Sequence, residues 1–322
     1  MLLISQRLFL ETIKKYCLAH NIAIEIRSGG WLVIMQRAAE RRLVIGYDIG
    51  LNSAVAHQVA NDKAACAEVL ASAGVAAVPH TLFLGARLSP HIPGSGSTEA
   101  MLRLLDAHPR GLVVKPNEGT SGELVVRVAT KAQLEQAVAR ILAAHPSVAI
   151  SPYVEIDDEV RVVLLDERAL IVYGKMRPQV TGDGVHSLRE LVRSALTAEQ
   201  LKAIADDFDA VELDAVPAAG ERRIVNWRHN LDSGATPVLL TDGATRETCI
   251  ALAVKAAQAL RIRFASIDVV HADGAWQILE VNSGVKMEAL GQRHPKLVEA
   301  AYAAALDEVF AQSRRPGEGR AP

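Results

Sequence analysis

Two apolar stretches joined by an Asp-Gly pair constrain the fold of this chain most strongly. Residues 266–270 (Ser-Ile-Asp-Val-Val) and 278–283 (Ile-Leu-Glu-Val-Asn-Ser) are rich in strand-forming residues, and Asp273-Gly274 lies between them. An Asp-Gly pair between such runs is typical of a hairpin turn. The sequence therefore predicts two adjacent antiparallel strands.

The polar residues of this hairpin converge if its loop has the right length. Side chains alternate between the faces of a strand, so Glu280 and Asn282 point the same way. A three-residue loop, 273–275, places Asp268 directly opposite Glu280, whereas a two-residue loop without a bulge puts these carboxylates on opposite faces. Opposed carboxylates destabilise a sheet unless a cation lies between them, and oxygen ligands of this kind suit Mg²⁺. The simpler alternative is a solvated sheet face.

Composition and charge narrow the class of protein. The chain has 322 residues, of which 50% are hydrophobic and 22% charged, and its formal net charge is -2. This predicts a globular protein of two or three lobes and argues against non-specific binding to nucleic acid or to a membrane surface.

No apolar run reaches the roughly 18 residues of a membrane span, and Arg7 and Glu11 stand where a signal peptide would be apolar. We therefore expect a cytoplasmic protein, with Cys17, Cys66 and Cys249 as reduced core residues.

A lysine-bearing strand precedes a loop of small residues near the middle of the chain. Residues 112–116 (Leu-Val-Val-Lys-Pro) are followed by 117–122 (Asn-Glu-Gly-Thr-Ser-Gly) and by a second apolar run at 124–128. Such a hairpin is flexible, and its backbone amides can close over an anion. Taken alone, Lys115 can also be a strand-end lysine that reaches for water, and the loop an ordinary turn.

The order of these elements resembles that of the ATP-grasp superfamily. The matching segments are 113–116 with the loop after it, 150–154, 159–161, Lys175, 228–230, Asp268 and 280–282. Within the superfamily the chain is most similar to the ligase domain of cyanophycin synthetases and to the ribosomal-protein glutamate ligases. That similarity lies in residues 181–191 (Thr-Gly-Asp-Gly-Val-His-Ser-Leu-Arg-Glu-Leu) and 230–236 (Asn-Leu-Asp-Ser-Gly-Ala-Thr). Structural context has to support such motif matches.

The resemblance implies an α/β (α+β) protein with the ATP-grasp fold. Two antiparallel-sheet lobes would sandwich ATP beside a small N-terminal α/β lobe. The expected division is an N-terminal lobe (1–60), linker helices and a strand (61–110), a lobe with the lid and phosphate loop (111–155), a lobe with the metal and substrate site (156–312) and a disordered tail (313–322).

The resemblance also implies roles for individual residues. The nucleotide phosphates would be bound by Lys115 and by the loop residues Gly119, Thr120, Ser121 and Gly122, and Lys63 would bind either the phosphates or the adenine. The adenine edge would meet the backbone around Ser151, Tyr153 and Val154, and the ribose hydroxyls would meet Glu159. One or two Mg²⁺ ions, for which Mn²⁺ can substitute, would be held by Asp268, Glu280 and Asn282. The γ-phosphate and the substrates would be surrounded by Arg161, Lys175, Arg228 and Asn230.

Three positions depart from the family pattern. The segment at Ser151-Pro152 lacks the Glu that the family usually has there, and Glu123 stands where a basic residue is frequent. Residues 283–288 (Ser-Gly-Val-Lys-Met-Glu) replace a run of small residues, Pro and Gly, so the substrate side of the site is changed.

The activity that the resemblance implies is an ATP-dependent carboxylate-amine ligase that works through an acyl phosphate. The chain lacks the Mur-ligase-like domain of cyanophycin synthetases, so we expect an amino acid or short peptide as substrate and no polymer synthesis. The alternatives are a small-molecule phosphotransferase and a nucleotide-binding module without turnover. The expected partners are the carboxylate and amine substrates, with no nucleic acid or membrane, and a homodimer can form through the apolar N-terminal lobe.

Overall fold

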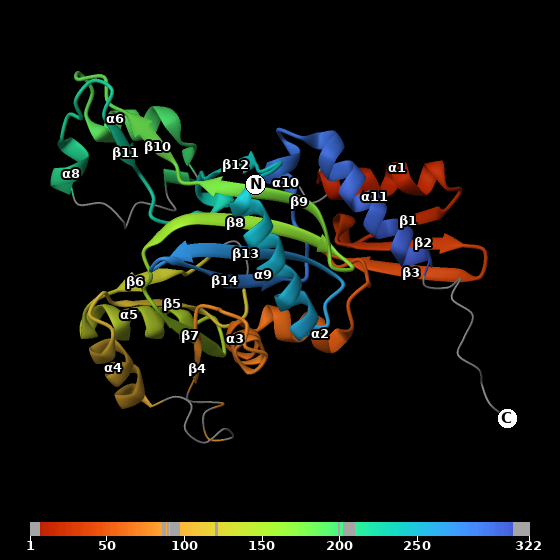
Figure 1. Cartoon of the computed structure of the whole chain (residues 1–322), viewed down its shortest axis with the longest axis horizontal. Helices are drawn as coiled ribbons and strands as arrows, with labels where there is room; N and C mark the ends of the chain where they lie inside the picture. The colour runs from red at the N-terminus through yellow and green to blue at the C-terminus, as the bar shows by residue number, and fades with distance from the viewer. Residues whose placement is uncertain are drawn as a thin grey trace.

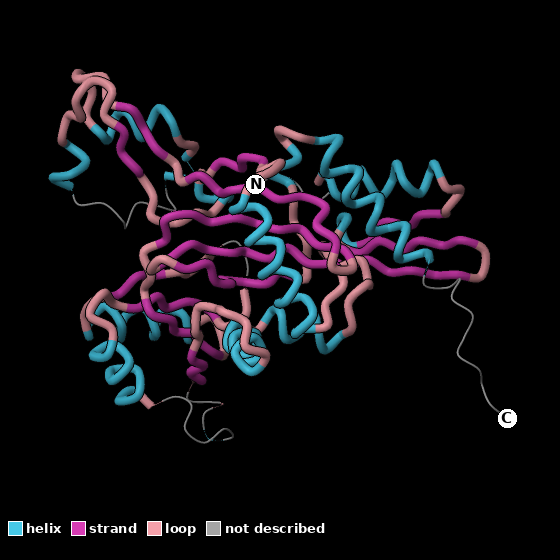
Figure 2. Tube along the Cα trace, viewed as in Figure 1, coloured by secondary structure: helices cyan, strands magenta, loops and turns pink. Residues whose placement is uncertain are grey.

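The computed structural model describes residues 7–85, 88, 90, 97–119, 122–198, 200–201 and 210–311. Two predicted phosphate-loop residues, Thr120 and Ser121, and the predicted tail 313–322 lie outside these ranges. The described chain combines helices with antiparallel sheets of five, four, three and two strands (Figures 1 and 2). No helix in this part of the chain is long and apolar enough to cross a membrane.

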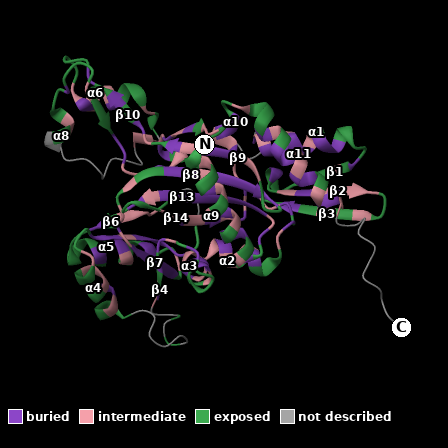
Figure 3. Ribbon diagram, viewed as in Figure 1, coloured by how far each residue is buried: buried purple, intermediate pink, exposed green. Residues whose placement is uncertain are grey.

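A five-stranded sheet forms the centre of the molecule. Its strands, in spatial order, are β12 (Thr236–Leu239), β9 (Arg168–Met176), β8 (Ile156–Leu165), β13 (Phe264–Ala272) and β14 (Ala275–Asn282). Nearly continuous apolar runs make β13 and the second half of β8 buried, as the purple strands of Figure 3 show. One face packs against helices α2 (Ala54–Asn61), α3 (Lys63–Ser72) and α9 (Ala244–Leu260). The opposite face of the sheet carries polar residues at one end and packs against another apolar core at the other end.

The predicted hairpin forms, but its loop differs from the expected one. Only Asp273 and Gly274 join β13 to β14, and both have positive φ (51° and 78°), so the expected three-residue loop is wrong. Regular pairing from this turn would set Leu279 opposite Asp268. A bulge at Leu279 shifts the register by one residue, and Asp268 pairs with Glu280 instead. The bulge thus produces the facing carboxylates that the longer loop was expected to produce.

A four-stranded sheet lies beneath the central one in Figure 1. Its strands, in spatial order, are β4 (Thr81–Leu84), β7 (Ser147–Pro152), β5 (Leu112–Pro116) and β6 (Val126–Val128). Apolar side chains from these strands share one core with helices α4 (Thr98–Ala107) and α5 (Lys131–Leu142). Helix α5 starts at a capping box in which Thr130 and Gln133 satisfy each other's backbone N–H groups.

The two ends of the described chain share a third core. Its elements are α1 (Leu8–Ala19), β1 (Ala23–Arg27), β2 (Leu32–Arg37), β3 (Glu40–Ile45), α10 (Glu288–Gly291) and α11 (Pro295–Ala311), with the short helix η2 (Ser28–Gly30) between β1 and β2. Helices α1 and α11 lie side by side at the right of Figure 1, and the Tyr16 hydroxyl donates to Asp307 at 2.8 Å between them. The end of the central sheet therefore packs on residues from both ends of the chain.

A small insertion projects from the central sheet at the upper left of Figure 1. It contains β10 (Gln179–Thr181), α6 (Leu188–Ala195), α8 (Ala210–Asp214) and β11 (Arg222–Ile224). Its own apolar core is built around Val180, Leu188, Val192 and Val225. The chain returns from it through the short helix η5 (Leu231–Ser233) to β12.

Candidate functional site

Strand register places the predicted polar residues in one row across the central sheet. Directly paired residues of neighbouring strands share a face. Asp268 pairs with Glu280 on β14 and with Arg161 on β8, and Arg161 pairs with Tyr173 on β9. The prediction that Asp268 faces Glu280 is confirmed, and Arg161 joins them on the same face.

The Asp268 side of this row is a closed cluster of charges. Arg161 donates from Nε and Nη2 to the two carboxylate oxygens of Asp268, each at 2.6 Å, and Lys175 Nζ lies 2.9 Å from Asp268 Oδ2. Lys175 also donates to the Glu159 carboxylate. Two acids thus balance two bases in a buried setting. Burial alone would raise the pKa of Asp268, but Arg161 and Lys175 hold that pKa below its usual value.

Glu280 and Asn282 form a more open side of the same row. The Glu280 side chain is 28% exposed, compared with 2% for Asp268, and its nearest cation is Lys63 Nζ at 3.6 Å. Asn282 pairs with Ser266, and its buried Nδ2 has no hydrogen-bond partner within the described ranges. Among the acidic side chains of this row, Glu280 is therefore the most exposed and the least tightly paired with a cation.

The oxygen donors of this row fit a divalent metal ion in part. Within the described ranges no three His, Cys, Asp or Glu side chains gather closely enough to hold a metal. The oxygens of Glu280 and Asn282 are of the kind that Mg²⁺ prefers. Both oxygens of Asp268 already accept from cationic partners, so Asp268 would offer a metal ion its remaining lone pair or give up one of those bonds.

Two predicted phosphate-binding lysines approach Glu280 from different elements. Lys63 is the first residue of α3, and its Nζ donates to the Gly119 carbonyl at 3.0 Å. Lys115 lies on β5 of the neighbouring sheet and is 8% exposed. Burial lowers the pKa of Lys115 to about 8, with Glu280 opposing that shift and Lys63 adding to it. Helix α3 and strand β5 thus both contribute positive charge near the Glu280 carboxylate.

The loop after β5 meets the loop that precedes β12. A Cβ atom at Gly122 would lie 2.5 Å from Asn230 Nδ2, and Gly122 has a φ of +72°, so a side chain there would clash and be strained. Arg228 Nη2 donates to the Val125 carbonyl at 2.9 Å, just beyond this loop. The structure therefore brings Arg228 and Asn230 against the predicted phosphate loop.

The predicted adenine-binding segment lies at the end of β7. Ser151 is buried and pairs with β5, and the Tyr153 N–H donates to the chain just before β5. The Tyr153 ring meets the edge of Trp227 at 5.9 Å between centroids, and the Arg127 guanidinium lies 3.6 Å from its centroid. Val154 follows, half-buried, after the strand has ended. The ring contacts connect this segment to the return from the insertion.

Three buried polar side chains beside the charged cluster were not predicted as site residues. The Tyr173 hydroxyl, the Ser266 hydroxyl and His229 Nε2 are without a hydrogen-bond partner in the described part of the chain. His229 Nδ1 lies 2.7 Å from the Lys175 carbonyl. Unpaired buried polar groups are costly, and in folded proteins a ligand or an ordered water usually supplies the missing partner. The sequence spacing could have identified two of them. Ser266 precedes Asp268 by two residues and Tyr173 precedes Lys175 by two, and residues two apart in a strand lie on the same face.

The arrangement of these sheets and their helices is the ATP-grasp fold. One solved structure that shares it is a bifunctional glutathione synthetase from Pasteurella multocida, with 16% sequence identity and a TM-score of 0.52. That match covers 94% of this chain and 45% of the other, so this chain spans less than half of that enzyme's length.

Another solved structure with this fold is the D-alanine–D-alanine ligase from Bacillus anthracis. It has 18% identity and a TM-score of 0.53 over 82% of this chain and 70% of the other. The same enzyme complexed with ATP gives 15% identity and a TM-score of 0.53 over 81% and 71%. No protein-family model and no curated protein matches the sequence. At these identities the likeness establishes the fold.

Proposed function

We propose that this protein is an ATP-dependent carboxylate-amine ligase that forms an amide or peptide bond through an acyl phosphate. One observation carries the proposal: facing carboxylates, Asp268 and Glu280, share a sheet face with Asn282, and fixed cations surround them within an ATP-grasp fold. Such a site suits a polyphosphate and a hard metal ion, and the proposed chemistry needs no Ser or Cys nucleophile. The names of the solved neighbours, a synthetase and a ligase, are in line with this activity.

The proposed nucleotide site lies between the two larger sheets. Lys63 and Lys115 would contact the phosphates, together with the loop residues Gly119, Thr120, Ser121 and Gly122. The adenine edge would lie against the backbone of Ser151, Tyr153 and Val154, and Glu159 would use the oxygen that is not bonded to Lys175 for the ribose. Mg²⁺, when bound by Glu280, Asn282 and Asp268, would supply charge neutralisation to the phosphates.

The proposed chemistry has two displacement steps. A carboxylate oxygen of the acid attacks the γ-phosphorus, the bond from that phosphorus to the β,γ-bridging oxygen breaks, and ADP leaves. The amine nitrogen then attacks the acyl carbon, the bond from that carbon to the phosphate oxygen breaks, and the nitrogen loses its extra proton. Both steps place negative charge on oxygens, which Arg161, Lys175 and Arg228 would stabilise. Closure of the loop after β5, held by Asn230, would keep water from the acyl phosphate.

The unpaired groups beside Arg161 fit the acid substrate. Tyr173, Ser266 and the Asn282 amide can each donate a hydrogen bond, and each lacks a partner within the described ranges. Donors of this kind next to a guanidinium are suited to a carboxylate. We assign the carboxylate of the acid to this position, where strand register also places Asp268.

Product analysis tests this function directly. Wild-type protein is incubated with Mg-ATP and a panel of amino acids and short peptides, and the released ADP, the phosphate and the product masses are measured. A product lighter by one water than its two substrates combined, formed only with ATP, would support the ligase. ADP with a phosphorylated product that needs no amine would identify a phosphotransferase. ATP binding without any turnover across the panel would argue for a binding module.

A further inference from the structure

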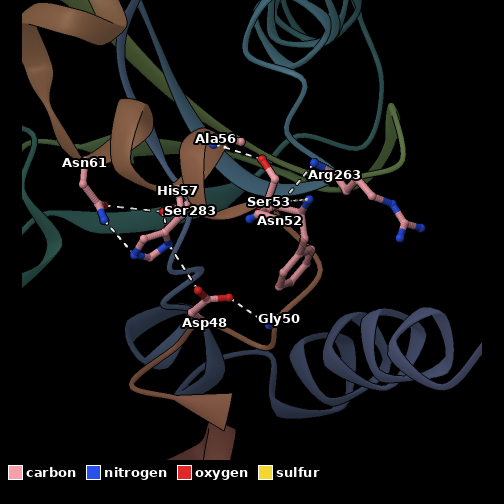
Figure 4. A network of polar contacts seen from close by, with 10 residues as sticks. Asp48, Gly50, Asn52, Ser53, Ala56, His57, Asn61, Arg263 and Ser283 are labelled. Carbon is pink, nitrogen blue, oxygen red and sulfur yellow. Dashed lines mark hydrogen bonds and ion pairs between the residues drawn. The ribbon is translucent and has the colours of Figure 1, made fainter. Parts of the chain in front are cut away.

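A polar network links the N-terminal lobe to the residue that follows Asn282 (Figure 4). His57, on helix α2, lies with Nδ1 2.9 Å from Ser283 Oγ and 3.3 Å from Asp48 Oδ2. Its other nitrogen, Nε2, lies 2.9 Å from Asn61 Nδ2, one turn further along the same helix. The imidazole is thus held on both sides by residues from three different segments.

The direction of these hydrogen bonds follows from the Asn61 amide. An amide nitrogen can only donate, so His57 Nε2 accepts and the ring proton lies on Nδ1. That N–H donates to Ser283 Oγ, with the Asp48 carboxylate close by, and the Ser283 hydroxyl lies 3.5 Å from Asn61 Oδ1. Asp48 is itself held by the Gly50 N–H at 2.8 Å. The result is a ring of donors and acceptors that leaves one orientation for the imidazole.

The network bears on the proposed site because Ser283 lies next to Asn282 in the chain. Ser283 is fully buried, and it directly follows the last residue of β14, Asn282. The pair formed by Asn282 and Ser266 is the final one between β13 and β14, so no ladder bond fixes the chain beyond it. The side chains of consecutive residues in a strand point to opposite faces. Hydrogen bonds that fix Ser283 on one face therefore also fix the direction of the Asn282 amide on the other.

We propose that His57 is a positioning residue for the metal-nucleotide site, acting through Ser283 on Asn282. This inference rests on the proposed function, because it assigns Asn282 to that site. Outer groups that hydrogen-bond near metal ligands typically change metal affinity by about 10–100-fold when they are removed. Helix α2 also ends only two residues before Lys63. The segment that contacts Ser283 therefore leads directly to a lysine that is proposed to bind phosphate.

Two substitutions of the same residue separate the two ring nitrogens. The amide nitrogen of Asn in His57→Asn lies near the place of Nδ1 and can still donate to Ser283, whereas that of His57→Gln lies near Nε2 and cannot. We expect His57→Gln to raise the Mg²⁺ concentration for half-maximal turnover by about tenfold and His57→Asn by about twofold. Ser283→Ala should match His57→Gln, and the double variant should be no worse than either single one. His271→Gln, which alters another half-buried His-Asp contact, with Asp157, is the matched control.

A binding measurement keeps the inference separate from the proposed function. Mg²⁺-dependent binding of ADP, followed by calorimetry and by the shift in melting temperature, needs no substrate and no turnover. If wild type makes no amide, the ligase proposal fails, and the same order of variants in ADP binding still supports a positioning role. Equal Mg²⁺ dependence for wild type and His57→Gln would overturn the role, as would a loss of melting temperature with no change in Mg²⁺ dependence. Wild-type ADP binding that ignores Mg²⁺ would overturn both proposals.

Discussion

Asp268 and Glu280 face each other across two strands, yet their surroundings are opposite. Asp268 is buried and bonded through both oxygens to Arg161 and Lys175, whereas Glu280 is 28% exposed and has Lys63 at 3.6 Å. A buried charge without its partner is strongly destabilising, whereas a half-exposed one is tolerated. The comparison indicates that Asp268 mainly holds the site together and that Glu280 is the carboxylate left open to a ligand.

The largest expected effect comes from removing the charge of Asp268. Asp268→Asn leaves Arg161 and Lys175 facing Glu159 alone, so the free energy of unfolding should fall by about 3–5 kcal/mol and turnover should be lost. Urea denaturation measures the first effect and ADP release the second. Because the pKa of Asp268 is lowered in the folded state, its contribution is present above the ordinary Asp pKa and is lost as the pH falls below it.

Asp273→Asn provides a control for this variant. It removes a carboxylate from the same strand pair, but Asp273 is exposed at the hairpin tip, where it pairs with Arg110. Its effect on the free energy of unfolding should be small, because solvent screens an exposed ion pair. An equally small cost for Asp268→Asn would mean that the buried cluster does not anchor the site.

The second largest effect concerns Glu280, whose removal should affect turnover and not stability. Glu280→Ala should lower turnover by at least about 10²–10³-fold while changing the free energy of unfolding by less than about 1 kcal/mol. Cys66→Ala serves as a control, since Cys66 and Glu280 line the same small pocket and burial raises the thiol pKa to about 12, which keeps it protonated. The control should keep turnover within about twofold. Comparable Mg-ATP turnover by wild type and Glu280→Ala would remove the argument for a metal site.

The third effect concerns Lys115 and depends on pH. With a pKa of about 8 in the free protein, Lys115 loses its charge as the pH rises, so ATP affinity should fall by about tenfold between pH 7 and pH 9. Arginine keeps its charge over that range, and Lys115→Arg should flatten the profile even if it weakens binding. A profile that falls equally in both proteins would assign the pH dependence to another group.

The smallest effect concerns the unpaired hydroxyl of Tyr173. Tyr173→Phe should raise the KM for the acid by about 2–10-fold, leave the KM for ATP unchanged and cost no stability, because the hydroxyl has no protein partner within the described ranges. Tyr302→Phe is the matched control: its hydroxyl accepts from the Met287 N–H and donates to the Val285 carbonyl, so stability should fall by about 1 kcal/mol. Identical behaviour of the two variants would exclude Tyr173 from the acid site.

The fold and the hairpin could be predicted from the sequence because they depend on local patterns and on the order of motifs, whereas the facing carboxylates were expected from a three-residue loop and arise instead from a bulge. Alternating apolar residues and an Asp-Gly turn specify a hairpin, and the motif order indicated the ATP-grasp fold. The bulge at Leu279 was not predicted, although it shifts the alternation by one residue, so that Ile278 and Val281, three apart in the sequence, face the same core.

The charged cluster could not be predicted because it depends on long-range register. Arg161 and Asp268 are 107 residues apart, and their pairing follows only from how β8 meets β13. The network around His57 was missed for a different reason, since helix α2 was not predicted. Ser53, which caps that helix, was the available signal.

The balance of charge around Asp268 has a consequence for how this protein is handled. In small domains built around a structural metal, a chelator removes the ligand that holds the chain together, and the domain unfolds. Here Arg161 and Lys175 already satisfy the buried carboxylate, so we expect the chain to fold without an added ion. Protein purified in the presence of EDTA should melt at the same temperature as protein purified without it, and returning Mg²⁺ should be enough to restore nucleotide binding.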